Sequence, residues 1–508
     1  MFRHISAGLA VAVVGIGSVV YAQKPAEDWV ATPDTPVVTQ TVQVKQEQAP
    51  VPETKSPDEQ LADLKGKVDG LDEPLAAMKS TVDKLSKIKM SGYAQFQVRS
   101  AVNYKDATDT TGTGKAYGTY KYAVGDFSGG KFGDRMGSVI QLRRARIKVA
   151  YESDLSQAVV QFDCVPFTLG NAATAVTSTF DTATNKVTNT YANSAYLSGG
   201  GVTIKDAFLL FTEPWLKSFA IKGGVFDRPF GFEISYSSSN RESPERSRFF
   251  QTLFPGERDL GVSLEYLPSD KISGIAQYLN LKFGAFTGNG INVETDNNRD
   301  YIGRLGVSIP ITSVNMGIDA GFSGYAGKVL DLSDTMFEVS SNSLVGTIGK
   351  KNKTVDRQYT GGDIQLYYGD VPALGGITLR GEIITGKQPG TKTSSGSPGS
   401  NVASTAAVYL RNFIGYYGML VQNIDPLKSQ LVLKYDVYDP NSDLSGNTIT
   451  SAMEMMYSTI GLGLVYHWDE NVKLVAYYDM VKNEKINLAP YNADVKDDIF
   501  TFRIQYKF

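Results

Sequence analysis

The sequence predicts an all-β protein, a closed transmembrane antiparallel β-barrel of about sixteen strands preceded by a short helical segment. Two observations support this fold class. From residue 88 onward, segments of about ten residues alternate apolar with polar side chains, as a strand between lipid and water requires. The connections between these segments are alternately short and long, as in barrels whose two ends face different compartments.

Composition excludes several other classes of protein. The chain has 508 residues, of which 42% are hydrophobic, and its net charge of −3 provides no basic surface for nucleic acid. Beyond the N-terminus there is no apolar run of about 18 residues, so helical membrane spans are not expected. A single cysteine, Cys164, and two histidines, His4 and His467, leave little material for metal sites or His-dependent catalysis. We expect no enzyme activity, no metal and no cofactor.

The N-terminal sequence predicts an export signal followed by a linker. Residues 1–22 have a basic start, an apolar core from Leu9 to Val20 and a small-residue cleavage site that ends at Ala22. An uncleaved anchor helix is the alternative, but the apolar core is shorter than the roughly 20 residues that span a bilayer. Residues 23–57 are rich in Pro, Gln and Thr, which favours a flexible linker.

A helical segment is predicted for residues 58–87. Its apolar residues recur at steps of three and four, which is a heptad seam and favours an associated coiled coil, trimeric in our interpretation. They are Leu61, Leu64, Val68, Leu71, Leu75, Met78, Val82 and Leu85. Because Pro74 lies inside the segment, we expect an isolated helix to be interrupted near Asp72. The alternative is a helix lying against its own barrel.

The barrel itself is assigned to residues 88–508. The predicted strands lie at residues 88–99, 138–151, 155–164, 203–213, 219–227, 260–267, 275–286, 301–309, 314–325, 359–368, 377–386, 413–421, 431–438, 458–468, 472–481 and 500–508. Every second connection is short, beginning with Glu152-Ser153-Asp154, and the others are long and rich in Gly, Ser, Asn and Thr. This alternation of short and long connections places both termini in the periplasm.

The third long loop, about residues 228–258, is predicted to fold inward. It contains five arginines and, with the flanking Asp227 and Asp259, six acidic residues. Aromatic rings are interleaved with them, which is more apolar surface than a solvated loop needs. Barrels of about this size hold a wet lumen. We therefore expect phenylalanines to pack on the inner wall and Arg241, Arg246 and Arg248 to line a constriction. Arg228 and Arg258, close to the strand ends, are interpreted as structural ion pairs.

Several segments resemble the phosphate-selective porin O and P family, outer-membrane channels of Gram-negative bacteria. The resemblance is carried by RPFGFE (228–233), by Ser247-Arg248-Phe249, by PGERDLGVSLEY (255–266), by LRRARIKV (142–149) and by the stretch from Gly415 to Asn441. It implies a trimeric outer-membrane channel with basic side chains in its constriction. The solute remains open, and the equal numbers of acids in the loop argue against strict phosphate selectivity.

Wall residues also suggest an anion path. Arg144, Arg146 and Lys148 share one face of a strand whose other face is apolar, and a cation facing mid-bilayer lipid costs roughly 2–4 kcal/mol. We therefore expect these three side chains to face the lumen, where fixed cations favour anions. The alternative for each is an ion pair with a lumen acid such as Asp163 or Asp363.

The function hypothesis is an outer-membrane porin. It would be a passive diffusion channel for small hydrophilic solutes with an anion preference, such as for phosphate, and would assemble as a homotrimer. The alternative is a plugged or structural barrel that serves as an anchor, adhesin or subunit of a surface assembly, with residues 58–87 engaging peptidoglycan or a periplasmic partner. An energised receptor would need a larger plug domain, and a barrel enzyme would have to depend on His467.

Overall fold

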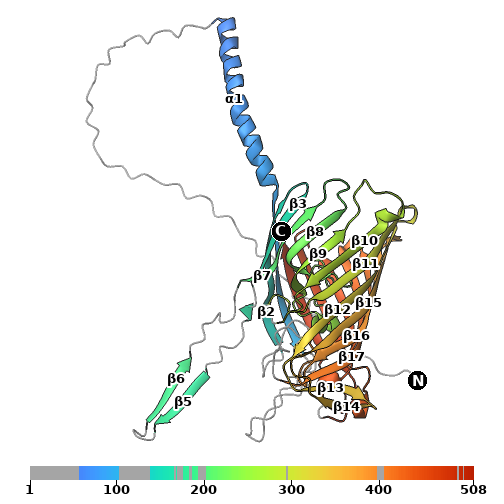
Figure 1. The fold of residues 1–508 in the computed structure, drawn as a ribbon. Coiled ribbons are helices and arrows are strands. Elements are labelled where there is room, and N and C mark those ends of the chain that lie inside the picture. The colour runs from blue at the N-terminus through green and yellow to red at the C-terminus, as the bar shows by residue number, and fades with distance from the viewer. Residues whose placement is uncertain are drawn as a thin grey trace, which may run out of the picture. The chain divides into compact units, whose positions relative to one another are not determined.

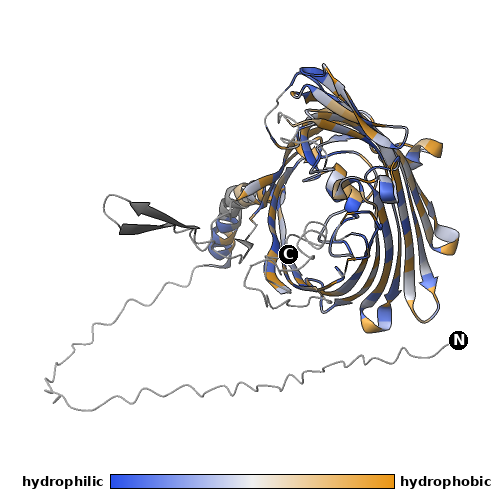
Figure 2. Ribbon diagram, turned by 90° about the horizontal axis from the view of Figure 1, so that it is seen from below, coloured by the Kyte–Doolittle hydropathy of each residue, from blue (hydrophilic) through white to orange (hydrophobic). Residues whose placement is uncertain are grey.

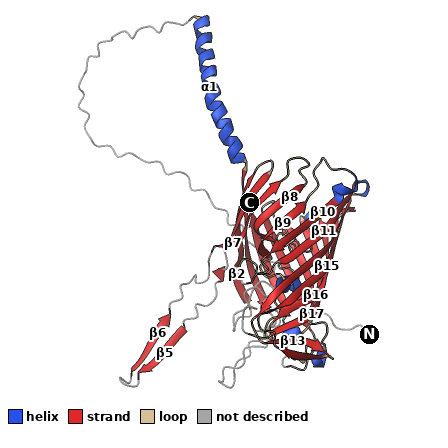
Figure 3. Cartoon of the chain, viewed as in Figure 1, coloured by secondary structure: helices blue, strands red, loops and turns tan. Residues whose placement is uncertain are grey.

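The computed structural model describes residues 56–101, 138–164, 167–168, 175–181, 186–192, 202–292, 296–396, 406–488, 491–495 and 497–508. The export signal (1–22), its cleavage site at Ala22 and nearly all of the linker (23–57) lie outside these residues. Within the described part, strands dominate and helices are few (Figure 3).

Helix α1 (Pro57–Ser86) precedes the barrel in sequence. Ser56 and Glu59 form a reciprocal capping box at its start, with Glu59 N–H donating to Ser56 Oγ (3.3 Å) and Ser56 N–H to Glu59 Oε2 (2.9 Å). The helix is continuous through Pro74, so the predicted interruption near Asp72 is wrong. Proline removes one backbone hydrogen bond, and a capped 30-residue helix retains many others.

The heptad side chains of α1 that the structure describes are all exposed. They are Leu61, Leu64, Met78, Val82 and Leu85. The coiled coil therefore stays a prediction. No helix in the described ranges is long and apolar enough to cross a membrane.

Sixteen antiparallel strands form a closed ring, as predicted (Figure 1). In order around the ring they are β1 (Ile88–Ala101), β2 (Ser138–Glu152), β3 (Ser156–Asp163), β7 (Thr203–Thr212), β8 (Phe219–Asp227), β9 (Arg258–Tyr266), β10 (Leu279–Phe286), β11 (Asp300–Ile311), β12 (Met316–Asp331), β15 (Lys353–Val371), β16 (Gly375–Gly390), β17 (Val408–Ile424), β18 (Ser429–Asp439), β19 (Tyr457–His467), β20 (Val472–Asn483) and β21 (Ile499–Lys507). The ring closes where β1 pairs with β21, with Tyr93 opposite Lys507.

Five short strands lie outside the ring. β4 (Phe167–Thr168) extends the sheet beside β2, and β5 (Ala175–Asp181) pairs with β6 (Lys186–Ala192) in a separate hairpin. β13 (Thr335–Ser340) and β14 (Ser343–Ile348) form a hairpin that the sequence analysis did not predict, and β13 runs parallel to the start of β17. Two predicted strand starts fall in 3-10 helices: Gly274–Tyr278 precedes β10, which begins at Leu279 rather than Ile275, and Thr312–Val314 precedes β12, which begins at Met316 rather than Val314. Several other strands, such as β15 and β17, are longer than predicted. Within the described ranges, three further short 3-10 helices lie in connections, at Asp425–Leu427, Gly446–Thr448 and Ala452–Glu454.

Side-chain alternation sorts the two faces of the wall. The outward face carries exposed apolar side chains such as Leu305 (54%), Phe322 (59%) and Ile383 (50%). The alternate residues, on the inner face, are polar, as the register pair Gln365 and Arg380 illustrates. This is the pattern of a barrel surrounded by hydrocarbon with a hydrated interior.

Candidate permeation path

The third long loop, residues 228–257, joins β8 to β9 and lies inside the ring (Figure 2). We call it loop 3. A backbone hydrogen bond from Arg228 N–H to Glu257 O (3.2 Å) closes its base, and it contains the short helix α2 (Arg248–Leu253). Its contacts follow the inner wall from β12 to β18 and on through β20, β21, β1 and β2.

Aromatic packing holds the α2 side of loop 3 against the wall. Phe249 and Phe254 are fully buried, and Phe254 packs against the rings of Tyr325 and Tyr359. On β17, a Cβ at Gly415 would collide with the Phe249 ring, so a residue without a side chain is needed for this approach. The phenylalanines thus bind the loop to the barrel, as the sequence predicted.

A wall carboxylate fixes the first turn of the loop. Glu382 on β16 accepts hydrogen bonds from the backbone N–H groups of Phe232 (2.9 Å) and Glu233 (2.7 Å). The turn requires Gly231, whose φ of +61° is in the left-handed region and whose missing Cβ would collide with the Glu382 carboxylate. Glu233 in turn binds Lys434 on β18 (2.8 Å).

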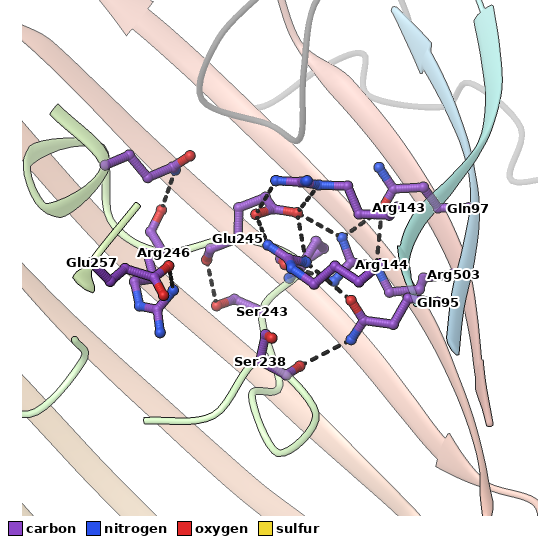
Figure 4. A network of polar contacts seen from close by, with 12 residues as sticks. Gln95, Gln97, Arg143, Arg144, Ser238, Ser243, Glu245, Arg246, Glu257 and Arg503 are labelled. Atoms are coloured by element: carbon purple, nitrogen blue, oxygen red, sulfur yellow. Dashed lines mark hydrogen bonds and ion pairs between the residues drawn. The ribbon is translucent and has the colours of Figure 1, made fainter. Parts of the chain in front are cut away.

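Glu245 is the centre of the largest charged cluster of loop 3 (Figure 4). Its carboxylate accepts from Arg143 Nε (2.9 Å), Arg144 Nη2 (2.6 Å) and Arg503 Nη2 (2.8 Å). Burial alone would raise the pKa of Glu245, but these three guanidinium groups outweigh it and hold the pKa well below its usual range. Glu245 is therefore ionised wherever the protein is folded at ordinary pH.

A β-bulge makes this cluster possible. Opposite β1, Gln95 pairs with Arg144 and Phe96 pairs with Leu142, so Arg143 is an extra residue in β2. In a regular strand Arg143 and Arg144 would point to opposite faces. Because of the bulge, both reach Glu245 inside the barrel, which the period-two pattern of the sequence could not indicate.

Backbone carbonyls of loop 3 are bound by wall side chains. Gln95 donates to Ser238 O (3.0 Å), and Lys473 donates to Ser239 O (2.8 Å) and Arg241 O (3.0 Å). These polar wall residues neutralise carbonyl groups that would otherwise be buried without partners.

The three predicted wall cations have different environments in the structure. Arg144 is buried and bound to Glu245. Arg146 binds Asp163 (2.7 Å) and donates to Tyr93 Oη (2.7 Å), so it follows the ion-pair alternative. Lys148 is half-buried and forms no ion pair with any described residue.

All three predicted loop arginines are buried. Their exposed fractions are 4% for Arg241, 8% for Arg246 and 8% for Arg248. Arg246 pairs with Glu257 and donates to the carbonyls of the loop, while Arg248 lies over the Tyr457 ring at 3.9 Å from its centroid. These contacts bind the loop together and to the wall. Arg246 and Arg248 also line a cavity with Lys434 and Asp436, and the constriction role of the three arginines stays a prediction.

Arg241 is a special case among these arginines. Within the described ranges its three guanidinium nitrogens have no hydrogen-bond partner. Burial, together with the neighbouring charges of Arg246 and Arg144, lowers the pKa of Arg241. Electrostatic repulsion from other cations therefore acts on this part of the loop.

The fully exposed residues of loop 3 are uncharged. Ser235, Ser237 and Asn240 are exposed, and Phe232 and Tyr236 are half-buried. A polar pocket of about 200 Å³ lies where the first turn of the loop meets β10, β11, β12 and β15.

The charged wall residues of that pocket are Lys282, Arg304 and Asp319, joined by Asp227 at the loop base. Arg304 is engaged by Asp363 (2.6 Å). Neither Lys282 nor Asp319 forms an ion pair within the part of the chain that the structure describes. The sequence analysis did not single out Lys282, because a lysine in an alternating strand gives no signal of which charges lie near it.

The sequence matches no protein-family model, and it matches no curated protein sequence. Among solved structures, the chain is similar to the outer membrane channel DcaP of Acinetobacter baumannii, with 12% identity, a TM-score of 0.45 and coverage of 83% of this chain and 97% of that chain. It is also similar to OprB of Pseudomonas putida (9%, TM-score 0.47, 84% and 96%) and to an anion-selective porin from Comamonas acidovorans (11%, TM-score 0.43, 83% and 99%). Identities of this size concern the fold alone.

Proposed function

We propose that the protein is an outer-membrane porin, a passive diffusion channel for small hydrophilic solutes with a modest anion preference. The closed ring supports a path across the membrane, because its outer face is apolar and its inner face polar. Loop 3 narrows that path from one side. Solutes would pass between its uncharged accessible residues and the wall from β3 to β11.

The anion preference rests on Lys148 and Lys282, two lumen lysines without an ion pair among the described residues. Fixed charges that are not held in a close ion pair attract permeating ions of opposite sign, although the nearby carboxylates of Glu152 and Asp227 reduce this effect. Asp319 opposes them, so the net effect is small. Strict phosphate selectivity of the kind that the family resemblance implies has less support, because Arg241, Arg246 and Arg248 are buried.

Reversal potentials in a salt gradient test the preference. We expect wild-type channels to pass chloride more readily than potassium, and both Lys148→Gln and Lys282→Gln to reduce that ratio. A unit charge contributes about 1 kcal/mol at 4 Å in water, so each change is at most about fivefold. Asp319→Asn should raise the ratio, and Lys428→Gln, at a short turn, should leave it unchanged. Cation preference in the wild type, unaltered by these variants, would remove the anion proposal.

The alternative is a plugged barrel that acts as an anchor or adhesin. One observation favours it: loop 3 is bound to wall strands on two sides of the lumen, by Glu382 and by Arg144 with Arg503. Liposome swelling with sugars of increasing size separates the two functions, because a plugged barrel admits none of them.

We further propose a homotrimer in which α1 forms a coiled coil. The support is the exposed heptad face of α1, because apolar side chains at these steps are stable in water only when another surface covers them. Peptidoglycan or a periplasmic protein would be the alternative partner of this face.

A further inference from the structure

A groove of about 620 Å³ lies on the outer face of the barrel, across β11, β12, β15 and β16. Its lining includes Gly303, Gly324 and Thr360, with the exposed rings of Phe283 and Tyr301 on one side. The volume lies within the roughly 300–1,000 Å³ that is typical of small-molecule sites. This groove takes no part in the permeation path, because it faces away from the lumen.

Strand register explains why the wall is hollow here. Gly303 pairs with Gly324, and Gly324 pairs with Thr360, so three adjacent strands present small outward residues at one level. At the next level toward the short turns, Leu305 and Phe322 form a ridge. A Cβ at Gly324 would meet no atom within 4 Å, which shows open space in front of it.

Stacked aromatic rings form the side wall of the groove. Phe283 is the register partner of Gly303, and its ring stacks on Tyr301 with centroids 6.3 Å apart and planes 11° apart. Flat rings on a small-residue floor make a concave apolar surface. Such a surface suits a narrow, flexible hydrocarbon chain.

Polarity changes at the upper edge of the groove, on the side of the long loops. In the next register level Tyr301, Ala326, Gln358 and Lys387 follow one another across four strands. Lys387 is exposed and forms no ion pair with a described residue. One level further, Lys328 is opposite Asp356, so their charges offset each other. Lys387 is therefore the cation that the groove offers to a ligand at the boundary between hydrocarbon and headgroups.

We propose that this groove binds an outer-leaflet lipid with a phosphorylated headgroup, whose acyl chain lies along Gly303 and Gly324 and whose phosphate contacts Lys387. The chain would bury the apolar floor and the aromatic side wall. The lysine ammonium would act as a point charge on the phosphate, as it does at membrane surfaces. The proposal requires that the barrel spans the membrane and does not depend on its conducting solutes.

Native mass spectrometry of the full-length protein in mild detergent, titrated with diphosphoryl lipid A, tests the acyl-chain part. Gly324→Leu should fill the groove and weaken lipid A retention about tenfold, without strain because the space is open. Gly418→Leu on β17 is the matched control, since that glycine is also outward-facing with nothing within 4 Å. Equal retention by the two variants would overturn the proposal.

The same titration with dephosphorylated lipid A tests the headgroup contact. Wild type should prefer the diphosphoryl form, and Lys387→Gln should lower that preference several-fold, whereas Lys428→Gln should not. An unchanged preference in Lys387→Gln would overturn the assignment of the phosphate contact. If Gly324→Leu instead reduced the oligomer mass while lipid A retention persisted, the groove would seat a second copy of the chain, and the lipid proposal would be wrong.

Discussion

Replacing Glu245 with glutamine should release loop 3 from the wall. The substitution keeps the shape of the side chain but removes the charge that binds Arg143, Arg144 and Arg503, and the Glu245 side chain is only 7% exposed. Removing one partner of a buried ion pair costs about 3–5 kcal/mol. Because the side chain of Arg143 is 28% exposed and partly screened, we expect the lower end, about 3 kcal/mol. That cost raises the undocked population of the loop on the order of a hundredfold.

Thiol labelling measures this population. Ser243 is 4% exposed, so a cysteine placed there, in a Cys164→Ser background, reacts with a thiol reagent only when the loop undocks. We expect Glu245→Gln to speed labelling of Ser243→Cys on the order of a hundredfold. Glu265→Gln, which removes a wall ion pair with Lys222 away from the loop, should leave the rate unchanged. Labelling of the Glu245 variant within about twofold of its parent would refute the argument that this cluster holds the loop.

Three further outcomes can be measured. Because the folded pKa of Glu245 is depressed, its contribution to docking is present above its unfolded pKa of about 4.3 and is lost only as the pH falls through the folded value. Since thiol labelling itself speeds up with pH as the thiolate forms, the Ser243→Cys rate is divided by that of a free thiol at the same pH. This ratio should be constant from about pH 5 to pH 8, and a change in it near pH 6 would contradict the argument. Gly231→Ala should destabilise the first loop turn by about 1–3 kcal/mol and broaden the single-channel current noise, and unchanged noise with an unchanged thermal midpoint would argue against the role of Gly231. Leu64→Ser combined with Leu85→Ser should dissociate the trimer in light scattering while the barrel remains folded, whereas a trimer of unchanged mass would place the contacts outside α1.

The barrel could be predicted from sequence because its signal is local. Lipid on one side and water on the other impose period two on every strand, and connections such as Asp425-Pro426-Leu427 are visibly short. The hairpin of β13 and β14 was missed because it lies in a long loop, where neither face meets lipid and the alternation is weak. Ile275 was assigned to a strand because its neighbours are apolar, yet a glycine with φ of +71° precedes it and begins a 3-10 turn.

The roles of individual charges could not be predicted, because they depend on partners far away in sequence. Arg246 and Arg248 look like constriction residues in a loop rich in charge, but the sequence could not indicate that Arg246 pairs with Glu257 or that Arg248 lies over the Tyr457 ring. Glu245 had no feature that distinguished it from the other loop acids, since its three arginines come from residues 143, 144 and 503. Arg258 was identified correctly as structural, because its acidic neighbour Glu257 is adjacent in sequence.

The position of Glu245 has a consequence for how the molecule assembles. Its arginines come from β2 and β21, the two strands that flank β1. β1 and β21 are the first and last strands of the barrel, and they pair only when the barrel closes. The part of the receiving site that binds Glu245 is therefore incomplete in a partly assembled sheet. A carboxylate from the middle of the chain thus joins side chains from both ends of the barrel, and this ion cluster is complete only when the first and last strands have paired.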